Sequence, residues 1–231
     1  MKQSRCYLAT IVTAIVAAAP LAAAPSIAGA ASGCGVFDGT VDPGGVCRSH
    51  TVTPRYELTI SYPVDYPDQQ AVTDFVAATR AKWAKISDAQ PLRDVPYLPT
   101  ISGTGYHSGP PQAGTRSLVF ALNSDFGAHP VTWFHALNYD VGRNVPITLG
   151  TLFKDGVDPV RVLAPIVKRE LAKRGLEADV SLDGVVAQDF EQFAITDDAV
   201  TFFLAQGLVL PQVDGPRRIT VPRSELASVL A

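Results

Sequence analysis

Residues 117–140, SLVFALNSDFGAHPVTWFHALNYD, carry the strongest secondary-structure signal in the chain. Two apolar runs, 117–123 and 131–140, have the length and composition of strands, and turn-forming residues separate them. The stretch therefore predicts a β-hairpin with its loop over 123–130. In the second run alternate residues share one face of the predicted strand; they are Val131, Trp133, His135, Leu137 and Tyr139.

A strand and a helix are predicted upstream of this hairpin. Apolar and polar residues alternate over 56–63, which is typical of a half-buried strand. Pro67 and Asp68 then mark a helix start, because proline suits the first helical position and an acid in the first turn matches the helix dipole. Apolar residues follow at three- and four-residue spacing, so one helix face should pack on a sheet; they are Val72, Phe75, Val76, Thr79, Trp83 and Ile86.

The rest of the chain adds a second long helix and several strands. Asp158 and Pro159 mark a helix start, and the pattern ends at Gly175. We expect a kink or restart at Pro165, because proline lacks the backbone donor of a helix interior. The remaining candidates are a short strand within 91–114, strands over 193–195, 200–204 and 218–221, and a short amphipathic helix over 222–230. Helices and strands mix without strict alternation, which predicts an α+β fold: a mixed sheet packed by two main helices.

Length and composition indicate a folded protein that is exported. The 231 residues are 47% hydrophobic and 18% charged, which supplies a core and excludes intrinsic disorder. Residues 1–30 begin with Lys2 and Arg5, continue in an Ala-rich apolar run and end in the small-residue triplet AGA at 28–30. This is the layout of a secretory signal peptide. An uncleaved membrane anchor is the competing interpretation, which the prolines in the run disfavour.

Cleavage after Ala30 makes the mature chain acidic. It removes Lys2 and Arg5 and no acidic residue, so 17 basic groups face 22 acidic ones and the net charge is −5. An acidic chain without a basic run is a poor candidate for binding nucleic acid. No later segment is apolar for long enough to span a membrane. We therefore expect a secreted protein, monomeric, in which an N-terminal segment (31–54) and an α+β domain (55–231) form one compact unit.

Cys34 and Cys47 are the two cysteines that cleavage would leave. An even pair in an oxidising compartment predicts a disulfide, which would staple the N-terminal segment. A second interpretation remains open. Residues 31–34, ASGC, look like a weak lipobox, and lipidation of Cys34 would anchor the protein in the cell envelope and leave Cys47 unpaired.

A search for catalytic or metal-binding residues finds no convincing set. The chain contains no G-x-S-x-G, S-x-x-K, H-E-x-x-H or P-loop motif. Its histidines are His50, His107, His129 and His135. His129 and His135 would lie about 20 Å apart on a strand, too far to share a metal ion. We expect His135 to be a hydrogen-bonded core residue and His129 to have a local structural role.

Asp197 and Asp198 are the one carboxylate pair worth testing as a glycosidase site. Acid and base carboxylates must face each other across the scissile bond, whereas these two residues are adjacent in sequence. Two aspartates between predicted strands are ordinary turn residues. The sequence therefore predicts no catalytic residue, no metal ligand and no cofactor site.

Several longer motifs resemble known families. In chain order they are GAHPVT at 127–132, NYD at 138–140, ITLGTLF at 147–153, FAITDDAVTFF at 193–203, GP at 215–216 and VPRSEL at 221–226. In this order and spacing they resemble the RsiV-type extracytoplasmic domain of anti-sigma factors that sense lysozyme. YPDQ at 66–69, TR at 79–80 and the cysteine pair make the chain similar to the secreted immunogenic antigens of mycobacteria, culture-filtrate proteins of the MPT/MPB type. The similarity runs from about residue 34 to residue 231.

The resemblance implies a compact, β-grasp-like α+β fold, secretion and no known catalytic activity. Only six residues precede the apolar run, so we expect no cytoplasmic segment that could hold a sigma factor. Binding of a host or envelope protein such as lysozyme is the part of the sensor role that would remain, and a net charge of −5 suits a basic partner. The motifs lie mainly at turns and buried strands, so no partner-binding residue is transferred. A secreted hydrolase acting on the cell envelope is the alternative from another functional class.

Overall fold

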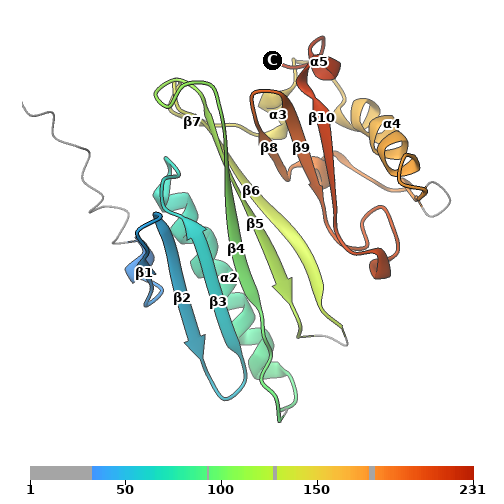
Figure 1. The fold of residues 1–231 in the computed structure, drawn as a ribbon. Helices are drawn as coiled ribbons and strands as arrows, with labels where there is room; N and C mark the ends of the chain where they lie inside the picture. The colour runs from blue at the N-terminus through green and yellow to red at the C-terminus, as the bar shows by residue number, and fades with distance from the viewer. Residues whose placement is uncertain (1–32, 93, 127–128, 177–179) are drawn as a thin grey trace, which may run out of the picture.

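The computed structural model describes residues 33–92, 94–126, 129–176 and 180–231. The predicted signal peptide lies outside these ranges. Figure 1 shows two sheets, each covered on its outer face by one long helix. This confirms the predicted α+β class, with a mixed sheet and two main helices; a second, three-stranded sheet accompanies the mixed one. Of the helices that the structure describes, none is long and apolar enough to cross a membrane.

The large sheet has seven strands in simple chain order, β1 to β7. The pair β3–β4 is parallel and the other neighbours are antiparallel. Its strands are β1 Thr40–Val41, β2 Val46–Val52, β3 Glu57–Pro63, β4 Thr100–Ser108, β5 Thr115–Ser124, β6 Val131–Asp140 and β7 Val145–Pro146. A parallel pair needs a crossover connection, and helix α2 (Gln69–Ala89) supplies it. The predicted hairpin over 117–140 is β5–β6.

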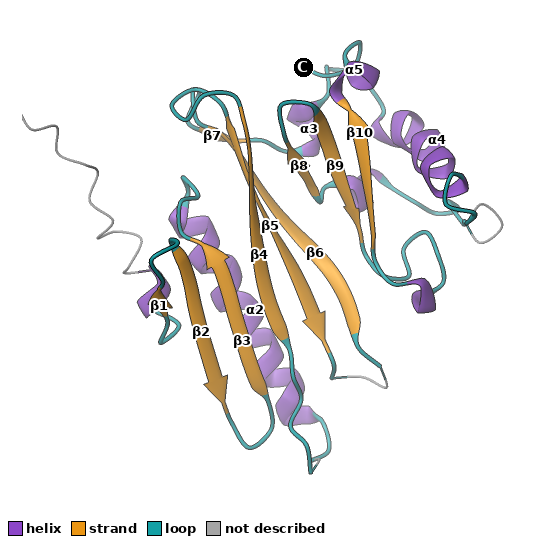
Figure 2. Cartoon of the chain, viewed as in Figure 1, coloured by secondary structure: helices purple, strands orange, loops and turns teal. Residues whose placement is uncertain are grey.

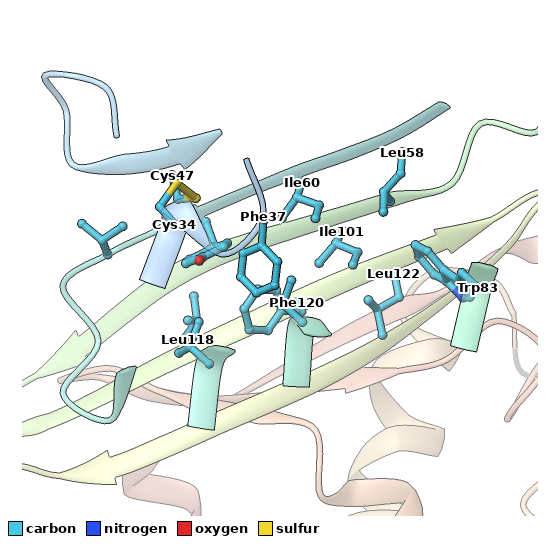
Figure 3. Close-up of a cluster of buried hydrophobic side chains, with 14 of the residues drawn as sticks. Cys34, Phe37, Cys47, Leu58, Ile60, Trp83, Ile101, Leu118, Phe120 and Leu122 are labelled. Atoms are coloured by element: carbon cyan, nitrogen blue, oxygen red, sulfur yellow. A yellow bond between two sulfur atoms is a disulfide. The ribbon is translucent and has the colours of Figure 1, made fainter. Parts of the chain in front are cut away.

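Helix α2 packs along one face of the large sheet. The Asp68 side chain caps it by accepting a hydrogen bond from the Ala71 amide at 3.0 Å. Pro67 therefore precedes the cap and is not the first helical residue. The Asp68 carboxylate can accept a hydrogen bond from a free amide of the first turn, whereas a proline side chain has no acceptor. Figure 3 shows Trp83 over the core formed with the strands. Its buried members include Leu58, Ile60, Ile101, Leu118, Phe120 and Leu122.

Strand β4 is longer than the short strand expected within 91–114. It spans nine residues and includes Gly103 and Gly105. Gly103 allows the strand to lie close to β3, because a Cβ atom there would stand 2.7 Å from the Tyr62 Cβ. The glycines that weaken the sequence signal for a strand are thus used for close packing.

The small sheet has the order β10–β9–β8, with β8 at Phe193–Ile195, β9 at Ala199–Leu204 and β10 at Arg217–Pro222. Figure 2 shows helix α4 (Pro159–Ala172) beside this sheet, on the side away from the large sheet. The core between them includes Leu163, Val167, Leu171, Phe202, Ile219 and Val221. Shorter elements complete this part: α3 Leu149–Leu152, α5 Arg223–Leu226 and the 3-10 helices η2 Ala187–Phe190 and η3 Gln212–Asp214.

Helix α4 begins as predicted and passes through Pro165 as one helix. Asp158 caps it and Pro159 occupies the first position. The predicted restart at Pro165 does not occur, because burial of the apolar face on both sides of the proline holds the helix on the small sheet. The helix ends at Ala172, and Gly175 adopts a φ of 73° in the turn that follows.

The two sheets pack face to face along β5, β6, β8 and β9. Val119, Phe134, Ala194 and Phe203 form a small core between them. Polar bonds cross the same interface: the Asn138 side chain donates to the Phe193 carbonyl at 2.9 Å, and the Ile195 amide donates to Ser117 Oγ at 3.1 Å. The order of layers is therefore α2, large sheet, small sheet, α4.

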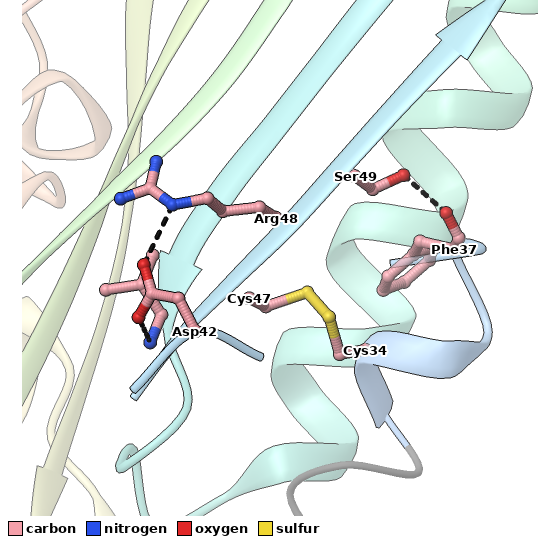
Figure 4. Close-up of a disulfide and its surroundings, with 7 residues drawn as sticks. Cys34, Phe37, Asp42, Cys47, Arg48 and Ser49 are labelled. Atoms are coloured by element: carbon pink, nitrogen blue, oxygen red, sulfur yellow. Dashed lines mark hydrogen bonds and ion pairs between the residues drawn. A yellow bond between two sulfur atoms is a disulfide. The ribbon is translucent and has the colours of Figure 1, made fainter. Parts of the chain in front are cut away.

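A disulfide joins Cys34 to Cys47, the pairing that the sequence predicts, and both residues are buried. Figure 4 shows it joining the short helical stretch before β1 to strand β2, next to the bond from Ser49 Oγ to the Phe37 carbonyl. Strand β2 pairs with β3 along its whole length, so the segment over 31–54 contributes strands to the large sheet. The sulfur of Cys34 cannot form this bond and also carry a lipid thioether.

Candidate functional site

The four histidines lie at separate places in the fold. His50 is on the outer face of β2, with Nδ1 3.3 Å from Thr59 Oγ1. His129 precedes β6 and its Nδ1 lies 3.5 Å from the Pro130 carbonyl, a local contact. His107 is on β4. Across the described ranges, no group of three His, Cys, Asp or Glu side chains is placed to hold a metal ion.

His135 is held by an aromatic contact and not by the hydrogen bond that we expected. Its ring stacks on Phe75 of α2, with centroids 3.8 Å apart and planes inclined by 13°. Burial lowers the pKa of His135. A neutral imidazole with an apolar neighbour can pack like any other flat side chain, which explains its place on the apolar face of β6.

Asp197 connects the two halves of the molecule. It accepts hydrogen bonds from the Gly109 amide at 2.7 Å and from Ser108 Oγ at 3.1 Å, at the end of β4. Arg223 donates to the same Ser108 hydroxyl at 3.1 Å, and its amide donates to the Asp198 carbonyl. The Gly109 bond first, then the Ser108 bond, lowers the pKa of Asp197. These bonds give Asp197 a structural role that the turn pattern alone did not indicate.

A cavity lies at the end of the large sheet, on the face that α2 covers elsewhere. Its volume is about 450 Å³. Figure 1 shows that β4, β5 and β6 extend beyond the first turn of α2, so this end of the face has no helix above it. The walls that matter chemically are Asp65, Tyr66, Gly105, His107, Arg116 and Leu118.

Two basic side chains stand next to each other in this cavity. His107 of β4 is directly opposite Arg116 of β5 in the strand register. Arg116 Nη1 donates to the Thr115 carbonyl at 3.0 Å. Among the described residues no carboxylate oxygen lies within 4.0 Å of its guanidinium group. No sequence motif indicates this pair, because His107 and Arg116 come together only through the β4–β5 register.

An aromatic wall closes the other side of the cavity. Tyr66 is 6% exposed, and its ring meets that of Tyr139 edge to face at a centroid distance of 6.3 Å. Burial, followed by the charge of Asp68, raises the pKa of Tyr66, so its hydroxyl stays protonated. Gly105 leaves open space, since a Cβ there would meet only Pro63 Cγ, at 3.4 Å.

The catalytic feature considered around this cavity is a hydroxyl–imidazole pair. In the part of the chain that the structure describes, Thr59 is the one hydroxyl within hydrogen-bond distance of an imidazole, that of His50. Both side chains are exposed and neither lines a cavity. A second cavity, of about 260 Å³ between Arg143, Ile195, Val200 and Arg223, contains no histidine.

Comparison with known proteins gives consistent matches. The model of a family described as "Protein of unknown function (DUF3298)" matches residues 150–224. The chain is 41% identical over 219 residues to esterase Rv3036c of Mycobacterium tuberculosis, covering 94% of this chain and 96% of that protein. It is 35% identical over 201 residues to immunogenic protein MPB64 of Mycobacterium bovis and to MPT64 of M. tuberculosis, covering 86% of this chain and 88% of each relative.

Two solved structures share the fold. A DUF3298 family protein from Pseudomonas aeruginosa superposes with a TM-score of 0.59 at 14% identity, over 83% of this chain and 96% of that one. A member of the same family from Bacteroides fragilis gives a TM-score of 0.52 at 13% identity, over 80% and 93% of the two chains. At these identities the likeness concerns the fold alone.

Proposed function

We infer that this chain, which belongs to the family of the mycobacterial immunogenic proteins MPT64 and MPB64, is an exported, non-catalytic binding protein with an antigen-like role. One observation carries the proposal: among the described residues, no hydroxyl that lines either of the two cavities above lies within hydrogen-bond distance of an imidazole. The pKa values of Asp42, Glu170 and Asp197 are all lowered by hydrogen bonds, so none of these three carboxyl groups suits the role of a general acid, which needs a raised pKa.

Export is supported by the cysteine chemistry and by the sequence of residues 1–30. A buried disulfide such as Cys34–Cys47 is typical of proteins that fold in an oxidising compartment. The basic start, apolar run and AGA triplet have the order of a cleavable signal. The narrower resemblance to anti-sigma factor domains stays a prediction.

We propose a basic protein of the host or of the cell envelope, lysozyme being the first candidate, as the partner. The support is electrostatic: the chain from 31 onward has a net charge of −5. The test is a titration of residues 31–231 against immobilised lysozyme over a salt series, with cytochrome c as a basic control of unrelated shape. Saturable binding to lysozyme alone that persists at about 0.15 M salt supports the proposal. Equal binding to both proteins, or loss of binding at that salt, contradicts lysozyme as the partner.

An esterase is the second candidate, because a relative that is 41% identical is named as one. In this chain the pair with the right chemistry is His50 and Thr59, where the imidazole can accept the hydroxyl proton across 3.3 Å. The assay is hydrolysis of p-nitrophenyl butyrate by the wild type and by His50→Gln and Thr59→Val. Thr100→Val is the matched control, since Thr100 pairs with Thr59 on the next strand.

The outcomes separate the two functions. Absence of hydrolysis in the wild type supports the binding protein. Hydrolysis that disappears in His50→Gln and Thr59→Val but persists in Thr100→Val identifies an esterase at this pair. Hydrolysis that survives all three substitutions also refutes the non-catalytic proposal and places the active site elsewhere.

A further inference from the structure

We propose that the cavity beside Arg116 and His107 binds a small organic anion, a carboxylate or phosphate monoester that carries a flat apolar group. The site goes beyond the protein-binding role proposed above and does not rest on it. A volume of about 450 Å³ falls in the range of ordinary small-molecule sites.

The basic pair provides the recognition of charge. Arg116 uses one donor on the Thr115 carbonyl at 3.0 Å, and the rest of its guanidinium group is available. A guanidinium group can donate two parallel hydrogen bonds to a carboxylate or phosphate. His107, opposite Arg116 in the register, adds a third donor on the same side of the cavity. Because the described structure shows no carboxylate paired with Arg116, an anion would not have to displace one there. The carboxylate whose charge acts on His107 is Asp197, which is held by Gly109 and Ser108.

The apolar wall provides the recognition of shape. Tyr66 and Leu118 line the cavity on the side of the core. They are 6% and 1% exposed, respectively. The missing side chain at Gly105 leaves room between this wall and the basic pair. A flat group stacked there would bury apolar surface while its charged end meets Arg116.

Asp65 allows the predicted charge of the ligand to be tested. Its side chain is exposed and lines the same cavity, so its negative charge opposes an anionic ligand. Removing that charge should strengthen binding of an anion and weaken binding of a cation. If the cavity merely traps apolar molecules, removing the Asp65 charge should change neither the affinity for an anion nor the affinity for a cation.

The experiment is a titration of the folded chain, residues 31–231, with benzoate and phenyl phosphate, followed by amide chemical shifts in heteronuclear NMR. Benzylamine is the cationic control. We expect saturable binding of at least one anion with a Kd of about 1 mM or tighter. Arg116→Gln should weaken it by about tenfold or more, and Asp65→Asn should strengthen it. Gly105→Leu should abolish it, because the side chain occupies the cavity.

Arg161→Gln is the matched control, since Arg161 lies on α4 and its side chain is 88% exposed. It removes the same charge far from the cavity and should leave the affinity unchanged. Failure of both anions to saturate would overturn the proposal. So would equal binding of benzylamine, or an affinity that falls as much in Arg161→Gln as in Arg116→Gln. The Arg116 and Asp65 variants keep the test valid if Gly105→Leu does not fold.

Discussion

Replacing Phe203 with alanine tests whether the two sheets form one cooperative unit. Phe203 is 1% exposed and lies at their interface, with ring centroids 5.3 Å from Phe134 and 5.9 Å from Tyr106. The Arg218 guanidinium group covers its ring at 5.4 Å. These aromatic neighbours lie on two different strands of the large sheet, β4 and β6, and cannot collapse readily into the space, so Phe203→Ala should cost about 3–5 kcal/mol of unfolding free energy.

Urea unfolding measures this loss. With an m-value of about 2 kcal/mol/M, the midpoint should fall by about 1.5–2.5 M. Trp83 and Trp133 both lie in the core under α2, so tryptophan fluorescence follows the large sheet while far-ultraviolet circular dichroism follows the whole chain. We expect the two transitions to coincide in the wild type and to move together in the variant.

Two results would refute this reasoning. A loss below about 1 kcal/mol would mean that the interface contributes little to stability. A shift seen by circular dichroism and not by fluorescence would mean that the small sheet unfolds independently. Val213→Ala is the control, because Val213 is 91% exposed and its removal should change the unfolding free energy by less than about 0.5 kcal/mol.

Other substitutions test the remaining structural claims. Replacing Cys34 and Cys47 with serine should lower the unfolding free energy by about 3 kcal/mol in a urea titration, and non-reducing peptide mapping that finds both thiols free in the exported protein would contradict the disulfide. The folded-state pKa of His135 is lowered by burial, so the unfolded state binds more protons and stability should fall as the pH drops below about 6.5; urea midpoints at several pH values should show a shallower dependence in His135→Phe. Gly103→Ala should destabilise the protein by about 1–3 kcal/mol in thermal unfolding, because its Cβ would stand 2.7 Å from the Tyr62 Cβ, and an unchanged midpoint would contradict that contact.

Local patterns in the sequence predicted the elements well where one periodicity dominates. The hairpin β5–β6 follows from two apolar runs within 117–140 that turn-forming residues separate, and α2 follows from its apolar spacing and from Asp68. The prediction for His135 was half right: it lies on the apolar face as expected, but its partner is Phe75 of α2. A partner on another element cannot be read from the spacing along one strand.

The residues of the candidate site were even harder to predict from spacing along the chain. His107, Arg116 and Tyr66 have ordinary sequence neighbours, and no motif connects them. They line one cavity because β4 and β5 pair in a particular register and because α2 begins too late to cover their end of the sheet. Likewise, Asp197 has the appearance of a turn residue, yet its bonds to Ser108 and Gly109 span nearly ninety residues of chain.

The amino-acid sequence by itself determined the α+β class, the two long helices, the central hairpin, the cysteine pair and the family, because these depend on local periodicity, caps and ordered motifs. Tertiary structure alone decided that the strands divide into two sheets, that Phe203 joins them and that a basic cavity forms at one end of the larger sheet. The physical reason is that side chains on neighbouring strands meet through register and layer packing, and both depend on contacts between residues far apart in the chain.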